Sequence, residues 1–158
     1  MENIYLCIMT RKLCHEFFKD FENDPDIFTD MDLFSEYKYD ISVVDRYFDS
    51  KQNENRVILA VMKEDKPIGE IQLKNIDHNS KECTLSIHMQ NDAVKGQGYG
   101  TYAEKLALEY AFGQLGIAAV NADTIIKNTR SQHVLEKVGF RYIKEENGFK
   151  YYRFECLI

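Results

Sequence analysis

The chain has 158 residues, of which 26 are acidic and 20 basic, so its formal net charge is −6 at pH 7. This charge argues against a general DNA- or RNA-binding protein, because it supplies no basic field for phosphates. With 44% hydrophobic residues and only two prolines, the sequence is not that of a disordered chain. Its length predicts a single domain over residues 1–158.

Neither export nor a membrane span is expected. The apolar run near the N-terminus has six residues, and no stretch approaches the roughly 20 apolar residues that a span requires. The four cysteines lie far apart, and neither they nor the four histidines are paired at the spacing of a zinc site. We therefore expect a cytoplasmic protein with reduced thiols, no metal and no membrane partner.

The first third of the chain predicts one strand and two helices. Residues 4–9 form a short apolar run that is typical of a strand, and residues 13–21 and 42–48 carry apolar side chains at helical spacing. The segment 20–32 is rich in carboxylates. It could attract a cationic acceptor, or it could simply be a solvated face.

Three short strands follow. Residues 57–62 are a compact apolar run, and residues 68–76 and 82–89 alternate between apolar and polar side chains. Tight polar turns separate the three segments, so we predict an antiparallel meander.

A long helix is predicted for residues 99–115. Its apolar face consists of alanine, leucine and tyrosine side chains, and Glu104 and Glu109 are expected to lie away from it. Residues 118–126 read as a further strand.

The last helix is predicted for residues 130–138. Thr129 and Gln132 have the spacing of a capping box, and Gly139 stands where a left-handed residue would end the helix.

A terminal hairpin is predicted for residues 140–144 and 149–157. The pair Asn147 and Gly148 between them is the strongest short signal for such a turn. The complete order is β-α-α-β-β-β-α-β-α-β-β, an α/β or α+β domain around one mixed sheet.

The run K-G-Q-G-Y-G at residues 95–100 lies between a predicted strand and the long helix. Alternate glycines let backbone N–H groups approach a ligand, and a helix N-terminus adds unsatisfied donors, so phosphate or pyrophosphate fits here. The same run could also be a turn that only begins a helix. It is not a Walker A loop, because it lacks G-K-[ST] after four intervening residues, and it is not G-x-G-x-x-G, because position 101 is threonine.

Two motifs together resemble one family. The pattern K-x-x-G-x-G at residues 95–100 resembles the acyl-CoA pyrophosphate loop of the GNAT superfamily of N-acetyltransferases. Residues 128–140, which read N-x-x-S and end in L-E-K-V-G-F, resemble the second signature of that superfamily. The likeness is greatest to the branch of ribosomal-protein N-terminal and spermidine acetyltransferases. It implies a mixed sheet with one splayed pair of strands.

The resemblance implies acetyl-CoA as co-substrate, with no metal. The strand before the glycine loop would pair with the pantetheine arm, the loop would receive the pyrophosphate, and the second signature would lie near the thiol. The implied co-substrate residues are Ile87, His88, Met89, Lys95, Gly96, Gln97, Gly98, Tyr99, Gly100, Thr101, Asn128 and Ser131.

The catalytic groups are less clearly indicated. Many relatives carry a tyrosine that protonates the leaving thiolate and a glutamate that acts as base; here those positions hold Leu135 and Thr84. Strand alternation places other polar side chains near the loop, and histidine has a suitable intrinsic pKa. The candidate catalytic residues are Ser131, His88, Glu82 and Glu70.

The resemblance implies transfer of an acetyl group to a primary amine by direct attack. The acceptor would be a small molecule, a protein N-terminus or another peptide amine. The assembly is left open between a monomer and a homodimer. Two alternatives remain: an acyl-CoA-binding regulatory module with little or no catalysis, and a nucleotide-binding α/β protein. Release of free CoA separates the first from an enzyme, and binding of ADP-ribose without CoA would favour the second.

Overall fold

Seven strands form one mixed sheet in the computed structural model, which describes residues 3–25 and 31–156. Their order across the sheet is β1-β2-β3-β4-β5-β7-β6. The strands are β1 (Ile4–Ile8), β2 (Val57–Lys63), β3 (Lys66–Asp77), β4 (Glu82–Met89), β5 (Ala119–Ile125), β6 (Arg141–Glu146) and β7 (Phe149–Glu155).

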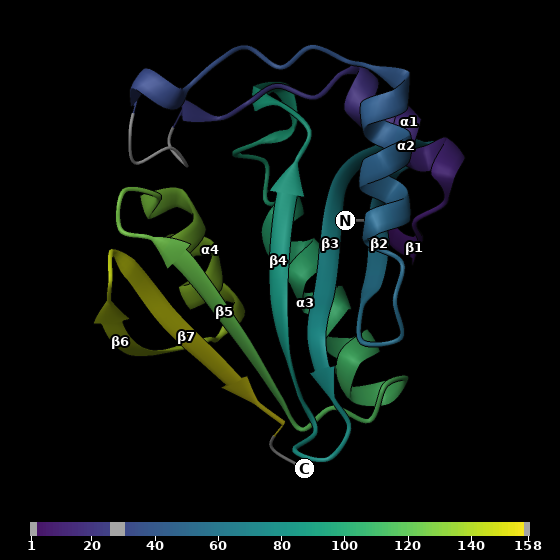
Figure 1. Cartoon of the computed structure of the whole chain (residues 1–158). Coiled ribbons are helices and arrows are strands. Elements are labelled where there is room, and N and C mark those ends of the chain that lie inside the picture. Colours follow the sequence, from purple (N-terminus) through teal and green to yellow (C-terminus); the bar gives the residue numbers. More distant parts are fainter. Residues whose placement is uncertain (1–2, 26–30, 157–158) are drawn as a thin grey trace.

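The junction between β4 and β5 divides the sheet. All other neighbouring strands are antiparallel, whereas β4 and β5 are parallel and pair only from Glu82 opposite Ala119 to Thr84 opposite Asn121. Beyond these three residue pairs the two strands separate, and Figure 1 shows β5 and β7 swinging away from β4. The rest of β4 therefore keeps backbone groups that β5 does not pair.

Helices cover both faces of the sheet (Figure 1). The pair α1 and α2 packs over one face of the first strands, and α3 and α4 lie against the opposite face. The helices are α1 (Arg11–Lys19), α2 (Ile41–Ser50), α3 (Tyr99–Gly113) and α4 (Thr129–Val138), with 3-10 turns η2 (Met31–Leu33) and η3 (Asp92–Val94).

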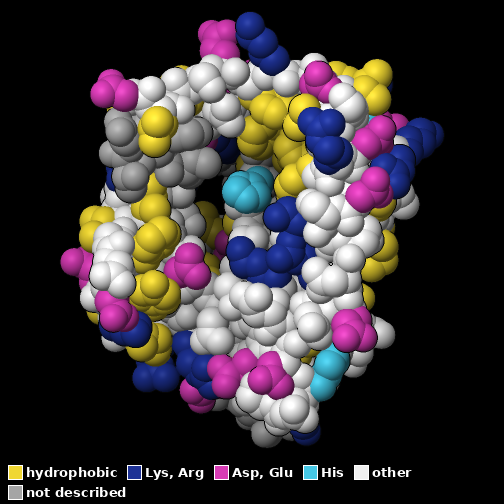
Figure 2. Space-filling view, in the orientation of Figure 1, with side chains coloured by type: hydrophobic (Ala, Val, Ile, Leu, Met, Phe, Trp, Pro, Cys, Tyr) yellow, Lys and Arg dark blue, Asp and Glu magenta, His cyan; other side chains and the backbone are white. Residues whose placement is uncertain are grey.

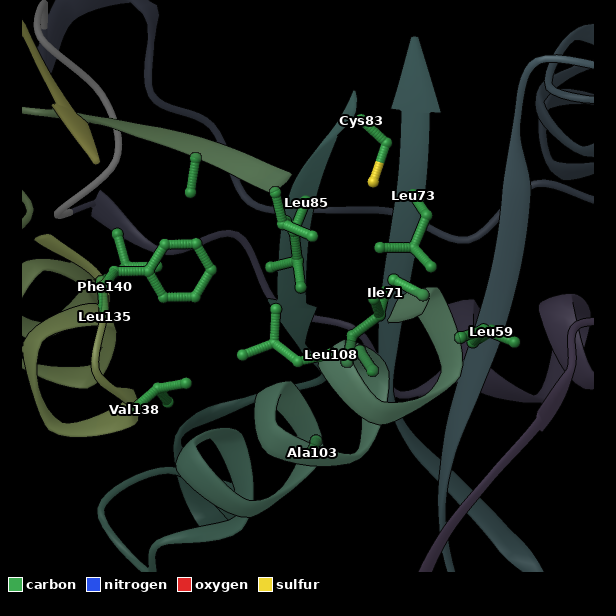
Figure 3. Packing of buried hydrophobic residues seen from close by; sticks show 14 of the residues in the cluster. Leu59, Ile71, Leu73, Cys83, Leu85, Ala103, Leu108, Leu135, Val138 and Phe140 are labelled. Atoms are coloured by element: carbon green, nitrogen blue, oxygen red, sulfur yellow. The ribbon is translucent and has the colours of Figure 1, made fainter. Parts of the chain in front are cut away.

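The larger apolar cluster lies between the sheet and α3 with α4. Ile71 and Leu73 of β3 and Leu85 of β4 point toward α3, where Leu108 meets them (Figure 3). A smaller cluster, which includes Val44 of α2, fills the space between the other face and α1 with α2. Adjacent residues along β3 and β4 thus face different layers, as the strand period requires.

The predicted order of strands and helices is confirmed, and the bounds move by a few residues. The helix α1 begins at Arg11 rather than residue 13, because the Thr10 side chain caps it by accepting from the Leu13 N–H at 3.2 Å. The terminal hairpin turns at Asn147 and Gly148, both with positive φ, as its sequence predicted.

Two local predictions are wrong. The cap of α4 is Asn128, whose Oδ1 accepts from the Ser131 N–H at 3.1 Å, and the Gln132 amide instead donates to the carbonyls of Ile125 and Ile126. Glu104 is only 1% exposed, although it was expected to lie away from the buried face. The buried arc of α3 is wider than one stripe, because α3 contacts both the sheet and α4.

Candidate active site

The separation of β4 from β5 creates a cleft, which Figure 2 shows as a hollow on this face. Three cavities meet there and share lining residues. They extend from the glycine loop, along the end of β4, to the start of α4. Two of the three cavities share Ile87 and four polar residues, so these four side chains surround the centre of the cleft: His88, Glu104, Asn128 and Ser131.

The glycine loop opens the N-terminus of α3 toward this cleft. Gly98 is the N-cap residue with φ +81°, and no side chain caps the helix there. Gly96 also has a positive φ of 72°. Such backbone conformations favour glycine, and the first-turn N–H groups are donors without intrahelical partners. This end of α3 is therefore suited to an anion.

Cationic side chains from two elements line the cavity beside that helix end. Lys95 comes from the loop, and Arg130 and Lys137 come from α4, around a volume of about 440 Å³. Arg130 and Lys137 are not among the residues predicted from the sequence. Their spacing with His133, at i, i+3 and i+7 directly after the second signature, places all three on one side of the helix and could have identified them.

Lys95 also contacts the acidic segment that follows α1. Its Nζ donates to Asp24 Oδ2 at 2.8 Å and lies 3.4 Å from Asp92 Oδ1. Phe21, Glu22 and Asp24 line the cleft. This part of the acidic segment is thus not a purely solvated face, whereas residues 26–30 lie outside the described residues.

Not every side chain of the loop faces the cleft. The Gln97 amide donates to the Ala93 carbonyl at 3.1 Å, and the Tyr99 ring packs against the core beneath the Lys63 ammonium. Thr101 lines the same cavity as the cationic side chains. The loop therefore offers mainly backbone groups to a ligand.

His88 and Glu70 are cross-strand partners on β4 and β3. The Glu70 carboxylate is 1% exposed and accepts hydrogen bonds from the Tyr47 hydroxyl and the Gln72 amide, both at 2.6 Å. The His88 ring is open to the cleft but surrounded by protein, and this desolvation lowers its pKa below the usual range; Glu70 opposes the shift. A neutral imidazole thus faces the cleft.

Glu82 lies at the other end of β4. Its carboxylate accepts hydrogen bonds from Arg153 and from the Asn121 amide, which ties β4 to β5 and β7 where the strands still pair. The hydrogen bond from Arg153 lowers the Glu82 pKa. Glu82 and His88 are six positions apart along the strand, a distance of roughly 20 Å. This position favours a role in the sheet rather than as a base in the cleft.

Leu135 and Ser131 face the inner part of the cleft. Leu135 is buried and joins the main apolar cluster, so it presents no proton there. Ser131 is half-buried in the first turn of α4 and, with its capping partner Asn128, lines the cavity. Of the four candidate catalytic residues, His88 and Ser131 line the cleft. Glu70 is buried beside His88 on the neighbouring strand, and Glu82 lies at the opposite end of β4.

Residues 8–141 match the family described as "Acetyltransferase (GNAT) domain". The chain belongs to the GNAT acetyltransferase family. A curated relative, the probable N-acetyltransferase YjcK of Bacillus subtilis (strain 168), is 29% identical over 90 residues. That match covers 57% of this chain and 50% of the relative, so it spans about half the length of YjcK.

Solved GNAT structures share the complete fold. A spermidine N-acetyltransferase from Vibrio cholerae, solved with CoA and spermine, has a TM-score of 0.78 at 15% identity, covering 98% of this chain and 96% of that chain. The microcin C7 self-immunity acetyltransferase MccE, solved with acetyl-CoA and AMP, has a TM-score of 0.76 at 20% identity, covering 99% and 94%. At these identities the likeness establishes the fold.

Within residues 3–25 and 31–156, no cluster of three or more histidine, cysteine, aspartate or glutamate side chains is placed to hold a metal ion. No helix in that part of the chain has the length and apolar character needed to cross a bilayer.

Proposed function

We propose that this GNAT protein is an N-acetyltransferase that moves the acetyl group of acetyl-CoA to a primary amine. The observation that carries the proposal is the uncapped N-terminus of α3, which opens at the glycine loop into the cleft between β4 and β5. An anion-binding helix end beside a splayed strand is what a long molecule with a pyrophosphate at one end and a thioester at the other requires.

The residues of the cleft fit acetyl-CoA along its length. The first-turn N–H groups of α3 and the cations Lys95, Arg130 and Lys137 would hold the phosphates. Residues 85–89 of β4 have no pairing with β5, so their backbone groups could pair with the pantetheine amides, as an added strand does. Ser131 would then lie near the thioester.

Acetyl transfer requires a neutral amine. The amine nitrogen bonds to the thioester carbonyl carbon, the carbon–sulfur bond breaks, one proton leaves the nitrogen, and one is taken up by the CoA sulfur. His88 suits the first proton transfer, because its lowered pKa leaves the imidazole free to accept a proton at neutral pH. With Leu135 in the inner cleft, Ser131 or water would supply the second proton.

The acceptor is proposed to be a small molecule or a peptide with a primary amine. Glu22 and Asp24 line the cleft and favour a cationic approach, although Asp24 is already bonded to Lys95. An α-amine is roughly 10% neutral at pH 7, whereas a lysine or polyamine amine is about 0.04% neutral. A weakly basic amine is therefore the acceptor that depends least on a base to remove its proton.

A monomer or homodimer stays the prediction for the assembly.

The second candidate function is an acyl-CoA-binding regulatory module. Leu135 supports it, since an apolar side chain stands where many relatives carry the residue that protonates the thiolate. The two candidates differ in one observable, the release of CoA that depends on an added amine.

The test incubates the protein with acetyl-CoA and a panel of amines, including a peptide with a free N-terminus and a polyamine, and follows free CoA thiol. We expect amine-dependent release with an acid limb below pH 6.5, where His88 takes up a proton. H88Q should lower kcat by about 10²-fold or more and remove the part of that limb that comes from His88, leaving only the part that comes from protonation of the amine. H78Q, in the exposed turn after β3, is the matched control. Binding of acetyl-CoA without turnover of any amine would favour the regulatory module.

A further inference from the structure

One buried carboxyl group in the cleft has no role in the chemistry above. Glu104, in the second turn of α3, is 1% exposed and lines the cleft beside His88 and Ser131. Its Oε2 has no hydrogen-bond partner among the residues that the structure describes. Buried polar atoms nearly always have a partner, and an orphaned one at the wall of a cavity indicates a ligand or a water that completes it.

The protonation state of Glu104 follows from its surroundings. Burial raises its pKa to about 8, and no cation is hydrogen-bonded to its orphaned oxygen. At neutral pH the group is therefore mainly a carboxylic acid, which has an O–H to donate. The charged or titratable groups that line the same cavities from neighbouring elements are His88, Asp123, Arg130, Lys95, Glu22 and Asp24.

We propose that Glu104 binds the acyl-CoA itself, by donating a hydrogen bond from its neutral carboxylic acid to a carbonyl oxygen of the pantetheine arm or the thioester. The inference rests on the proposed function, because it places acetyl-CoA in this cleft. Glu104 reaches the cleft from α3, between the diverging β4 and the start of α4. The pantetheine arm of acetyl-CoA, which carries the amide carbonyls, has to pass this point between the glycine loop and Ser131.

A hydrogen-bond donor that can lose its proton gives the site a pH dependence. Above about pH 8 the carboxylic acid becomes a carboxylate, which has no proton to donate and repels a carbonyl oxygen. Affinity for acetyl-CoA should therefore fall in the alkaline range. A glutamine at this position keeps an N–H donor at every pH, and a methionine of similar length keeps none.

The experiment measures the Kd of acetyl-CoA by calorimetry at pH 6.5, 7.5 and 9 for the wild type, E104Q and E104M. At pH 6.5 we expect the wild type and E104Q to bind alike and E104M to bind about fivefold to tenfold more weakly, the value of one hydrogen bond. At pH 9 the wild type should have lost a similar factor relative to E104Q. E109Q, an exposed glutamate of the same helix, is the control and should follow the wild type.

Two results would overturn the inference, and they distinguish its own failure from failure of the proposed function. If the wild type binds acetyl-CoA but E104M binds as tightly, and the ratio of wild type to E104Q does not change with pH, Glu104 does not contact the ligand. If the wild type binds no acetyl-CoA at any pH, the proposed function fails and this inference fails with it. Because E104M removes a buried carboxyl group without leaving a cavity, loss of folding does not confuse the comparison.

Discussion

Glu70 and Glu104 are two carboxyl groups buried to the same degree on opposite faces of one sheet. On the face covered by α1 and α2, Glu70 accepts from Tyr47 and Gln72 within the protein. On the face covered by α3, the Oε2 atom of Glu104 has no partner among the described residues. Burial alone therefore does not distinguish a structural carboxylate from one that is held ready for a ligand; the completeness of its hydrogen bonds does.

The two ends of the β4–β5 junction differ in the same way. At the closed end of the β4–β5 junction, Glu82 is bonded to Arg153 and Asn121 and helps hold three strands together. At the open end, where pairing has stopped, the polar groups around the cleft include Glu104 and the unpaired edge of β4. The end whose polar groups are hydrogen-bonded within the protein stabilises the sheet. The end where such partners are missing is available for binding.

The largest expected effect is the pH dependence that Glu104 gives to the free energy of unfolding of the protein. Its folded pKa of about 8 lies above its ordinary value of 4.5, so the folded state binds more protons between those values. Stability should therefore fall as pH rises from about 4.5 to 8, by about 4 kcal/mol. E104Q, which cannot ionise, should lack this slope. Urea unfolding at pH 5 to 9 measures the difference, and parallel curves for the two proteins would contradict the burial of an orphaned acid.

The next effect concerns Glu70. E70A should lower the free energy of unfolding by about 2–3 kcal/mol, because it leaves the Tyr47 hydroxyl and the Gln72 amide without their shared acceptor. E109A, on the exposed side of α3, should stay within about 0.5 kcal/mol of the wild type. Denaturant unfolding at pH 7 compares them. If E70A is no more destabilising than E109A, the hydrogen bonds of Glu70 do not stabilise the fold, and its contrast with Glu104 does not hold.

The smallest effect concerns the closed end. R153M should cost about 1 kcal/mol, since the ion pair with Glu82 is partly exposed and screened by solvent. The same variant should leave the Kd of acetyl-CoA within about twofold, because Arg153 lies where the strands still pair. A tenfold loss of affinity in R153M would show that the two ends are not independent.

Much of the fold could be predicted from the sequence. Period-two alternation identified β3 and β4, and the pair Asn147 and Gly148 identified the terminal hairpin, because both signals are local. The alternate glycines of residues 95–100 are a local signal as well, whereas the N-x-x-S motif is recognised by its resemblance to a family signature. The structure places both at the same cleft.

The missed features depend on contacts between distant segments. A single apolar stripe on residues 99–115 predicts that Glu104 lies away from the buried face, whereas packing against both the sheet and α4 buries a wider arc of α3. The pairing of Lys95 with Asp24 joins residues 71 positions apart. The position at which β4 and β5 stop pairing depends on tertiary packing, so it cannot be predicted from the sequence of either strand alone.

The central claim is that the cleft between β4 and β5 binds acetyl-CoA, and thermal unfolding with added ligand tests it most directly. Acetyl-CoA at 100 times its Kd should stabilise the protein by about 2.7 kcal/mol, which corresponds to a rise in Tm of roughly 5–11 °C for a chain of this size. ATP and NAD at the same concentration should raise Tm much less. No rise with acetyl-CoA, or an equal rise with all three ligands, would contradict the account.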